Sequence, residues 1–139
     1  MRKYKTWWWV AVVLQLITAA IHALSFLNEP VPANDTEKQL IDLMQNYRQN
    51  LAGMEITMDG LLTALSACFS LLYLFAGLVN AYLLRRCQDD ALLKGVLWIN
   101  LPIFGICFAV MAAFTFPPPI ILTGLVFIFL ALAKVFQTR

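Results

Sequence analysis

The sequence is short of charged residues, histidine and glycine, and each shortage excludes a class of protein. Only 13% of the 139 residues are charged and 61% are hydrophobic, whereas a soluble domain carries about a quarter charged residues. His22 is the only histidine, and zinc sites use several His or Cys ligands, so we predict no metal and no cofactor. The six glycines form no phosphate-binding loop, and the sequence contains no serine-hydrolase or zinc-protease motif.

The three cysteines are too few and too dispersed for a disulfide framework. Cys68 and Cys107 fall inside apolar runs, and Cys87 falls in a short polar gap. No Cys-x-x-Cys pair is present, which excludes a membrane thiol oxidase that passes electrons to a quinone.

Four apolar runs fill most of the chain, and we predict that each crosses a bilayer. A hydrocarbon core about 30 Å thick needs roughly 20 residues of helix. The first run follows a basic start but lacks a small-residue cleavage site, so we interpret it as a retained helix rather than a signal peptide. The short connections between the later runs favour antiparallel neighbours. The predicted fold is all-α, a transmembrane up-down-up-down four-helix bundle in a single domain, with spans at residues 7–27, 60–84, 91–116 and 119–136.

The sizeable polar segment between the first two runs carries a helical pattern of its own. Thr36 offers a helix cap. The apolar residues that follow at helical spacing are Leu40, Leu43, Met44, Tyr47, Leu51 and Met54. We therefore predict an extra amphipathic helix over residues 36–53, ending in a bend at Gly53. Its apolar face would lie on the membrane surface or cover the outer mouth of the bundle.

The distribution of lysine and arginine predicts the orientation of the chain in the membrane. One side holds Arg2, Lys3, Lys5, Arg85, Arg86, Lys94, Lys134 and Arg139. The segment between the first two runs holds Lys38 and Arg48 against six acids. We therefore expect a multi-pass protein of the plasma (inner) membrane with both termini in the cytoplasm. Anionic lipid headgroups can account for the basic side, so no nucleic-acid partner is implied.

Two of the apolar runs carry polar residues at steps of three or four. The second run and its approach hold Glu55, Asp59, Thr63, Ser66, Ser70, Tyr73, Gly77 and Asn80. The first run and its end hold Gln15, Thr18, His22, Ser25 and Glu29. Polar side chains are costly in hydrocarbon, so each stripe should face protein or a water-filled cavity. The seam between these two helices is therefore the expected place for a functional site.

The outer end of this seam is the strongest candidate for a functional site. His22 ends the first helix, and Glu55, Asp59 and Thr63 are expected in the first turns of the second, where all could converge beneath the amphipathic helix. A histidine beside carboxylates could transfer protons or bind a ligand, or it could simply fix the packing of the two helices. Arg48 could supply a countercharge to Glu55 or Glu29, or remain solvated.

The inner part of the seam holds three amides, Gln15, Asn80 and Asn100. Such side chains commonly hydrogen-bond between membrane helices, at about 1 kcal/mol or less each. A ligand site lined by amides is the alternative. Ser66 could line a cavity or, as a small residue, allow close helix packing.

The chain resembles a family of small bacterial four-span membrane proteins with no established activity. The residues that carry the resemblance are Met44, Tyr47-Arg48 and Gly53, Gly77-Leu78-Val79-Asn80, and Phe116-Pro117-Pro118. The resemblance spans nearly the whole chain and implies the four-helix fold. The architecture is also similar to DoxX-like proteins and to the sterol-isomerase and sigma-2-receptor group, which bind sterols or lipophilic amines through buried acids. No motif matches these two groups residue by residue, so no site is transferred from them.

Three functions are compatible with these patterns. The first is non-catalytic, either a binder of small lipophilic ligands or an accessory subunit of a membrane complex. The second is an intramembrane enzyme of isomerase type, in which His22 with Glu55 or Asp59 moves protons on a lipid-like substrate. The third is a conductor of protons or small solutes along the stripe from Glu55 to Asn80. Expected partners are membrane lipids and either another membrane protein or a second copy of this chain.

Overall fold

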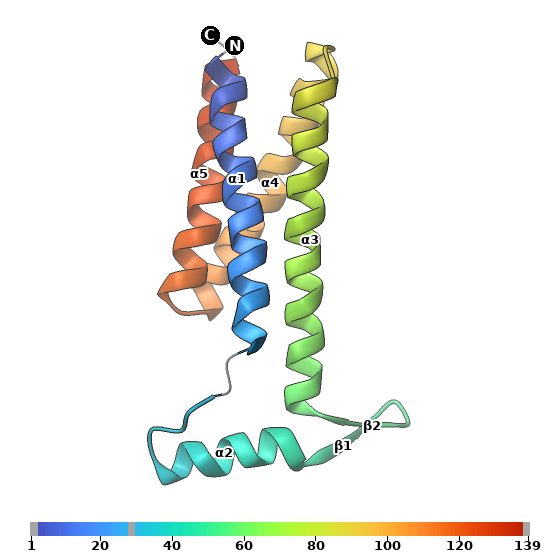
Figure 1. Ribbon diagram of the computed structural model, residues 1–139, viewed down its shortest axis with the longest axis vertical. Coiled ribbons are helices and arrows are strands. Elements are labelled where there is room, and N and C mark those ends of the chain that lie inside the picture. The colour runs from blue at the N-terminus through green and yellow to red at the C-terminus, as the bar shows by residue number, and fades with distance from the viewer. Residues whose placement is uncertain (1–2, 28–29, 138–139) are drawn as a thin grey trace.

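Four long apolar helices dominate the computed structural model, which describes residues 3–27 and 30–137. They are α1 (Lys3–Leu24), α3 (Met58–Arg86), α4 (Asp90–Phe114) and α5 (Pro117–Gln137). Among the described residues, these four are long and apolar enough to cross a membrane. Their directions alternate along the chain, and the N- and C-terminal ends lie together at one end of the bundle (Figure 1). The predicted all-α up-down-up-down bundle is therefore confirmed.

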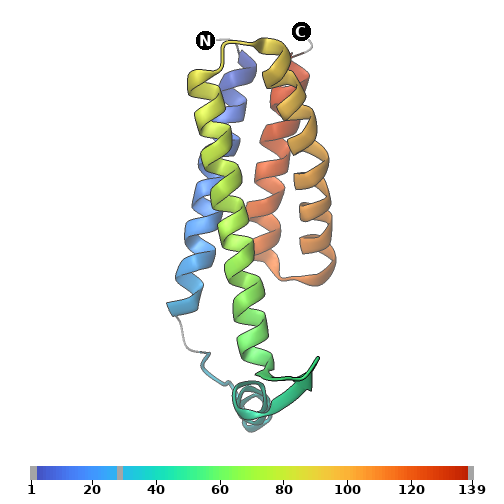
Figure 2. The same cartoon turned by 90° about the vertical axis from the view of Figure 1, so that its right-hand side faces the viewer.

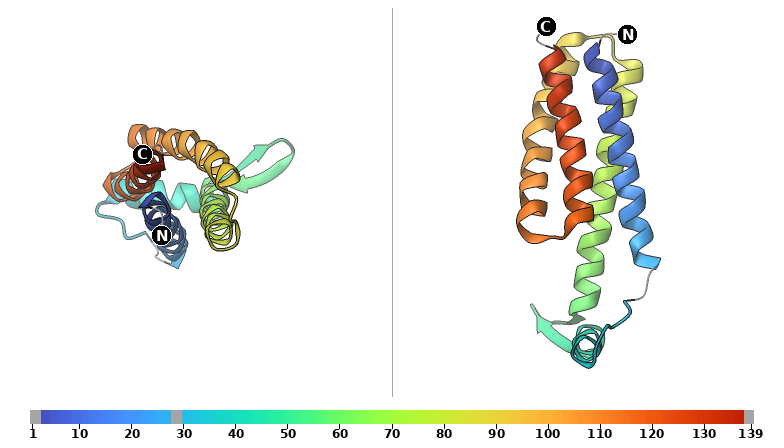
Figure 3. Two further views of the ribbon diagram at one scale, coloured as in Figure 1. Left: turned by 90° about the horizontal axis from the view of Figure 1, so that it is seen from above. Right: turned by 90° about the vertical axis from the view of Figure 1, so that its left-hand side faces the viewer.

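The packing of these helices follows a different order from the sequence. α1 packs against both α5 and α3, and α5 packs against α4, whereas α3 and α4 share few backbone contacts although they are consecutive. α4 begins beside α3 and runs obliquely toward the outer end of α5 (Figures 1 and 3). The two helices therefore diverge toward the end of the bundle that is remote from the termini, which we call the outer end.

Large side chains of α1, α4 and α5 form the core at the terminal end. Trp8, Leu97 and Leu130 are fully buried there. α4 and α5 approach closely because Phe127 lies over Gly105 and Phe108 lies over Gly124, with the two rings stacked 6.2 Å apart. Small residues allow such close approach of membrane helices, where van der Waals packing drives association.

The segment between the first two spans folds into a helix and a hairpin. After a short 3-10 turn (Ser25–Leu27), helix α2 (Asp35–Asn46) is followed by strands β1 (Arg48–Leu51) and β2 (Met54–Thr57). The predicted amphipathic helix over 36–53 is thus right only as far as Asn46. Ala52 and Gly53 both have positive φ, 53° and 84°, and form the two-residue turn that reverses the chain.

The cap of α2 and the bend at Gly53 can be compared directly with the sequence prediction. Asn34, not Thr36, caps α2, accepting a hydrogen bond from the Glu37 amide at 2.9 Å. The bend predicted at Gly53 is confirmed, but it joins two strands rather than two helices. α3 then begins directly after β2, and its first turns extend farther outward than the other spans (Figure 2).

Candidate functional site

A cavity of about 590 Å³ lies at the outer end of the bundle, where α3 and α4 diverge. Its walls come from α1, the turn after it, α3, the end of α4 and the start of α5. The lining residues are Thr18, Ile21, His22, Ser25, Leu65, Ser66, Phe69, Met111, Thr115, Phe116, Pro118, Pro119, Leu122 and Thr123. The volume falls in the range of small-molecule sites, roughly 300–1,000 Å³, and the lining is mostly apolar, as such sites are.

Helix geometry explains why these residues share one space. Thr18, Ile21 and His22 lie at steps of three and one on α1, so they present one face toward α3. On α3, Ser66 and Phe69 are three residues apart and face back toward α1. The three consecutive prolines from 117 to 119 end the α4–α5 connection and start α5, since a proline is tolerated in the first turn of a helix. Thr115 and Phe116 of this connection, with Pro118 and Pro119, therefore form part of the cavity wall.

Most hydroxyl groups of the cavity donate their proton to their own helix. Thr18 Oγ1 donates to the Leu14 carbonyl at 2.8 Å, Thr115 Oγ1 to the Met111 carbonyl at 2.7 Å, and Thr123 Oγ1 to the Pro119 carbonyl at 2.8 Å. Ser25 Oγ likewise donates to the His22 carbonyl at 2.6 Å. These oxygens can still accept a hydrogen bond, but their donor capacity is used.

His22 and Ser66 are the polar side chains of the cavity that keep their hydrogen-bonding capacity. The His22 ring is half-buried and contacts Phe69 and Phe26 edge-on, with centroids 5.0 and 5.7 Å apart. Within the described residues, neither the imidazole nor the Ser66 hydroxyl hydrogen-bonds to another side chain. A ligand's polar group could therefore be bound by one imidazole and one hydroxyl.

The acids predicted beside His22 lie elsewhere. Glu55 belongs to β2 rather than to the start of a helix, because the Ala52-Gly53 turn carries residues 48–57 into the hairpin. Glu55, Asp59 and Thr63 are all exposed, as is Arg48 on β1, and none of them lines the cavity. The expected convergence of His22 with Glu55 and Asp59 is therefore not found. The contact expected between Arg48 and Glu29 lies outside the described residues.

No residue of α2 lines the cavity either, so the expected lid over it is not formed by this helix. Within the described part of the chain, no group of three or more His, Cys, Asp or Glu side chains could hold a metal ion. Of the two positions predicted for the apolar face of this helix, the one on the membrane surface stays a prediction.

The inner amides do meet. Asn80 Nδ2 donates to Gln15 Oε1 at 3.2 Å and to Asn100 Oδ1 at 2.9 Å, so one side chain joins α1, α3 and α4. Gln15 is 0% and Asn80 2% exposed. Asn100 Nδ2 also donates to the Val96 carbonyl at 2.9 Å, while Gln15 Nε2 is buried without a partner among the described residues. The expected hydrogen bonding between helices is confirmed.

Aromatic side chains separate this amide cluster from the outer cavity. Tyr73 is buried between Phe69, 4.6 Å away, and Phe104, 5.3 Å away, and its hydroxyl lies 3.3 Å from Cys107 Sγ. The Gly77 position, one turn farther inward, is filled by Leu16. The polar stripe of α3 is thus interrupted by packed side chains and does not form a continuous polar path in the described structure.

The sequence prediction missed the contributions of α4 and α5. Met111, Leu122 and the two threonines, Thr115 and Thr123, belong to runs that were interpreted only as spans. The sequence nevertheless contains a signal for them. Thr115 and Thr123 are the threonines of the last two runs, and a hydroxyl in an apolar helix marks a side that faces protein or a cavity.

Comparison of the chain with protein-family models, with curated proteins and with solved structures finds no match. The resemblance to the family of small four-span bacterial proteins therefore stays a prediction.

Proposed function

We propose that the protein binds a small lipophilic molecule in the outer cavity. The observation that carries the proposal is a space of about 590 Å³ with mostly apolar walls, set within four helices of membrane-spanning length. In a bilayer, lipid surrounds helices of this length and offers a high local supply of lipophilic molecules. Burying the hydrocarbon part of a ligand against these walls gives roughly 25 cal/mol for each Å² of apolar surface.

The polar groups of the cavity define the class of ligand further. The described lining contains no carboxylate, so a cationic ligand would lack a counter-ion. The His22 imidazole and the Ser66 hydroxyl can each donate one hydrogen bond and accept another. The described lining contains no lysine or arginine either. We therefore expect a hydrocarbon body with one small uncharged polar group, such as an alcohol or a protonated fatty acid.

The other candidate functions have less support. An isomerase-type mechanism needs a carboxylate beside His22, and the acids expected there are exposed outside the cavity. A conductor needs a polar path along α3, and Tyr73 with its aromatic neighbours fills that path. A role as an accessory subunit of a membrane complex is compatible with the same cavity. The experiment below distinguishes this role from ligand binding.

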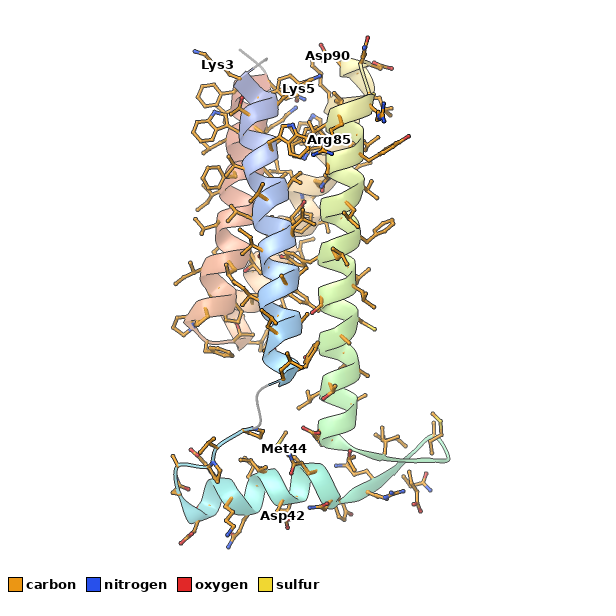
Figure 4. The ribbon with its side chains drawn as sticks, viewed as in Figure 1. Lys3, Lys5, Asp42, Met44, Arg85 and Asp90 are labelled. Carbon is orange, nitrogen blue, oxygen red and sulfur yellow. The ribbon has the colours of Figure 1, made fainter. Side chains whose placement is uncertain are left out.

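We further propose that the protein resides in the inner membrane with its termini in the cytoplasm. Figure 4 shows Lys3, Lys5 and Arg85 at the terminal end of the bundle and Asp42 at the other. An excess of Lys and Arg marks the cytoplasmic side of a multi-pass protein.

Native mass spectrometry of the gently solubilised protein tests ligand binding. We expect an adduct with the mass of a lipid or fatty acid, or of an added photoactivatable fatty acid after irradiation. Replacing Ser66 by Leu places a larger side chain inside the cavity and should reduce the adduct at least several-fold.

Cys68→Leu is the matched control, because Cys68 lies on the same helix but is exposed outside the cavity lining. Equal adduct in both variants would contradict the proposal, since it would show lipid bound only to the outer surface. A co-purifying protein chain without any lipid adduct would favour the accessory-subunit alternative.

A further inference from the structure

Helix α2, outside the spanning bundle, has an apolar face that the described residues leave uncovered over most of its length. α2 lies across the outer end of the bundle, roughly at right angles to the four spans (Figure 1). Figure 4 shows Met44 on the side facing the bundle and Asp42 on the opposite side. Leu40 and Leu43 lie on the Met44 face by helical spacing, yet they are 56% and 58% exposed.

The hairpin, like α2, has one face with large apolar side chains and one polar face. In the β1–β2 register, Gln49 pairs with Ile56 and Leu51 with Met54. Because side chains alternate along a strand, these four residues share one face. The other face holds Arg48, Asn50, Glu55 and Thr57, all of them polar. Leu51 and Met54 are large apolar side chains that remain exposed.

From these two faces we infer a lipid-binding surface. We propose that α2 and the hairpin, residues 35–57, form an interfacial platform that rests on the outer lipid surface of the same membrane. Its apolar residues enter the boundary between headgroups and acyl chains, to a depth of about 5–10 Å. We call this segment the outer platform.

The position of the outer platform matches this boundary. α3 has 29 residues and is therefore about 43 Å long, close to the 40–45 Å thickness of a bilayer with its headgroups. α3 starts directly after β2, so the platform lies at the level of one headgroup layer. Because α2 lies roughly at right angles to the spans, it runs parallel to the membrane plane.

The shape of the molecule indicates that lipid, rather than protein, contacts the apolar side of the outer platform. Viewed along the bundle, the hairpin projects beyond the four helices (Figure 3). The contacts of α2 with the spans are chiefly with the start of α3. The apolar face of the hairpin, which extends past the bundle at membrane level, therefore lies over acyl chains, while α2 crosses beneath the ends of the spans (Figure 3).

The charge of the outer platform specifies the kind of lipid surface. Residues 35–57 carry four acids, Asp35, Glu37, Asp42 and Glu55, and two bases, Lys38 and Arg48, a formal charge of −2. Attraction to anionic headgroups therefore does not drive binding, in contrast to basic amphipathic helices. Burial of the apolar side chains drives binding instead, so a zwitterionic lipid surface is sufficient.

Spin-label accessibility in phosphatidylcholine nanodiscs tests the platform. In a cysteine-free background, a nitroxide is attached at position 44 or 54 on the apolar faces, or at position 42 or 55 on the polar faces. We expect the first pair to collide several-fold more with oxygen, which partitions into lipid, than with a water-soluble nickel chelate. We expect the reverse at Asp42 and Glu55, which serve as matched controls.

High nickel accessibility at all four positions would overturn the proposal, because the platform would then stand in water. Protection of positions 44 and 54 from both reagents would also overturn it, because protein would cover the face. The unmodified chain gives an independent readout by hydroxyl-radical footprinting. Met54 is 66% exposed in the protein, yet in nanodiscs it should oxidise about as slowly as Met111 in α4, and fast oxidation would contradict burial in lipid.

Discussion

Asn80 joins three helices through one side chain, which makes it the most consequential polar residue of the spans. Its amide donates to Gln15 on α1 and to Asn100 on α4. In an apolar environment, removing one partner leaves the others with unsatisfied groups, which costs more than the hydrogen bond itself.

We therefore predict that Asn80→Leu lowers the free energy of unfolding by about 1–2 kcal/mol. Unfolding in mixed micelles with increasing SDS measures this value. Val79→Leu, a change at an exposed neighbouring position on α3, should be close to neutral. If the amides act together, Asn80→Leu and Asn100→Leu combined should cost less than the sum of the single changes.

The candidate residues differ in how well sequence predicts their surroundings. Gln15, Asn80 and Asn100 were predictable as a group, because amides in apolar helices seek one another. The association of His22 with Glu55 and Asp59 was not, since spacing alone cannot show that the chain reverses at Ala52 and Gly53. His22 therefore reaches a cavity whose remaining walls come from helices that are distant in sequence.

At the scale of helices, the contact between α1 and α3 depends on the absence of a side chain at Gly77. A Cβ added there would lie 2.7 Å from Leu16 Cδ2 and 3.1 Å from Leu16 Cγ. Such a contact forces Leu16 or the helices to move, and overpacking of this kind costs about 1–3 kcal/mol.

Gly77→Ala should therefore be less stable than Gly95→Ala by about 1–3 kcal/mol. A Cβ added at Gly95 on α4 would enter open space, with no other atom within 4 Å. Both changes gain the same helix propensity, so their difference isolates the packing cost. The SDS unfolding experiment measures it, and equal stability of the two variants would show that Leu16 adapts freely.

Hydropathy predicted the four spans to within a few residues, because the bilayer imposes a length on every apolar helix. The hairpin at 48–57 was not predictable in the same way. Its apolar residues continue the helical spacing of α2, and its two-residue turn is Ala-Gly rather than the Asn-Gly or Asp-Gly that usually marks such turns. Strands of four residues offer too few alternations to outweigh the helical pattern.

At the scale of the whole molecule, the proposed orientation leads to a direct prediction. A membrane-impermeant maleimide should label Asn50→Cys, on the hairpin, in intact cells when the natural cysteines are replaced. Cys87, in the turn between α3 and α4, should be labelled only after the cells are permeabilised when it is the only cysteine kept. Labelling of Cys87 in intact cells would reverse the orientation.

The pairing of the first and last helices also affects the order in which the protein can be assembled. Trp7 of α1 stacks on Phe129 and Phe136 of α5, at 5.7 and 5.8 Å, and α5 leaves the ribosome after the other three spans described here. Because α3 and α4 make few backbone contacts, the spans synthesised earlier cannot complete the bundle among themselves. Until α5 is inserted, this face of α1 stays open to lipid, so the nascent chain is most vulnerable to degradation or mispairing at that stage.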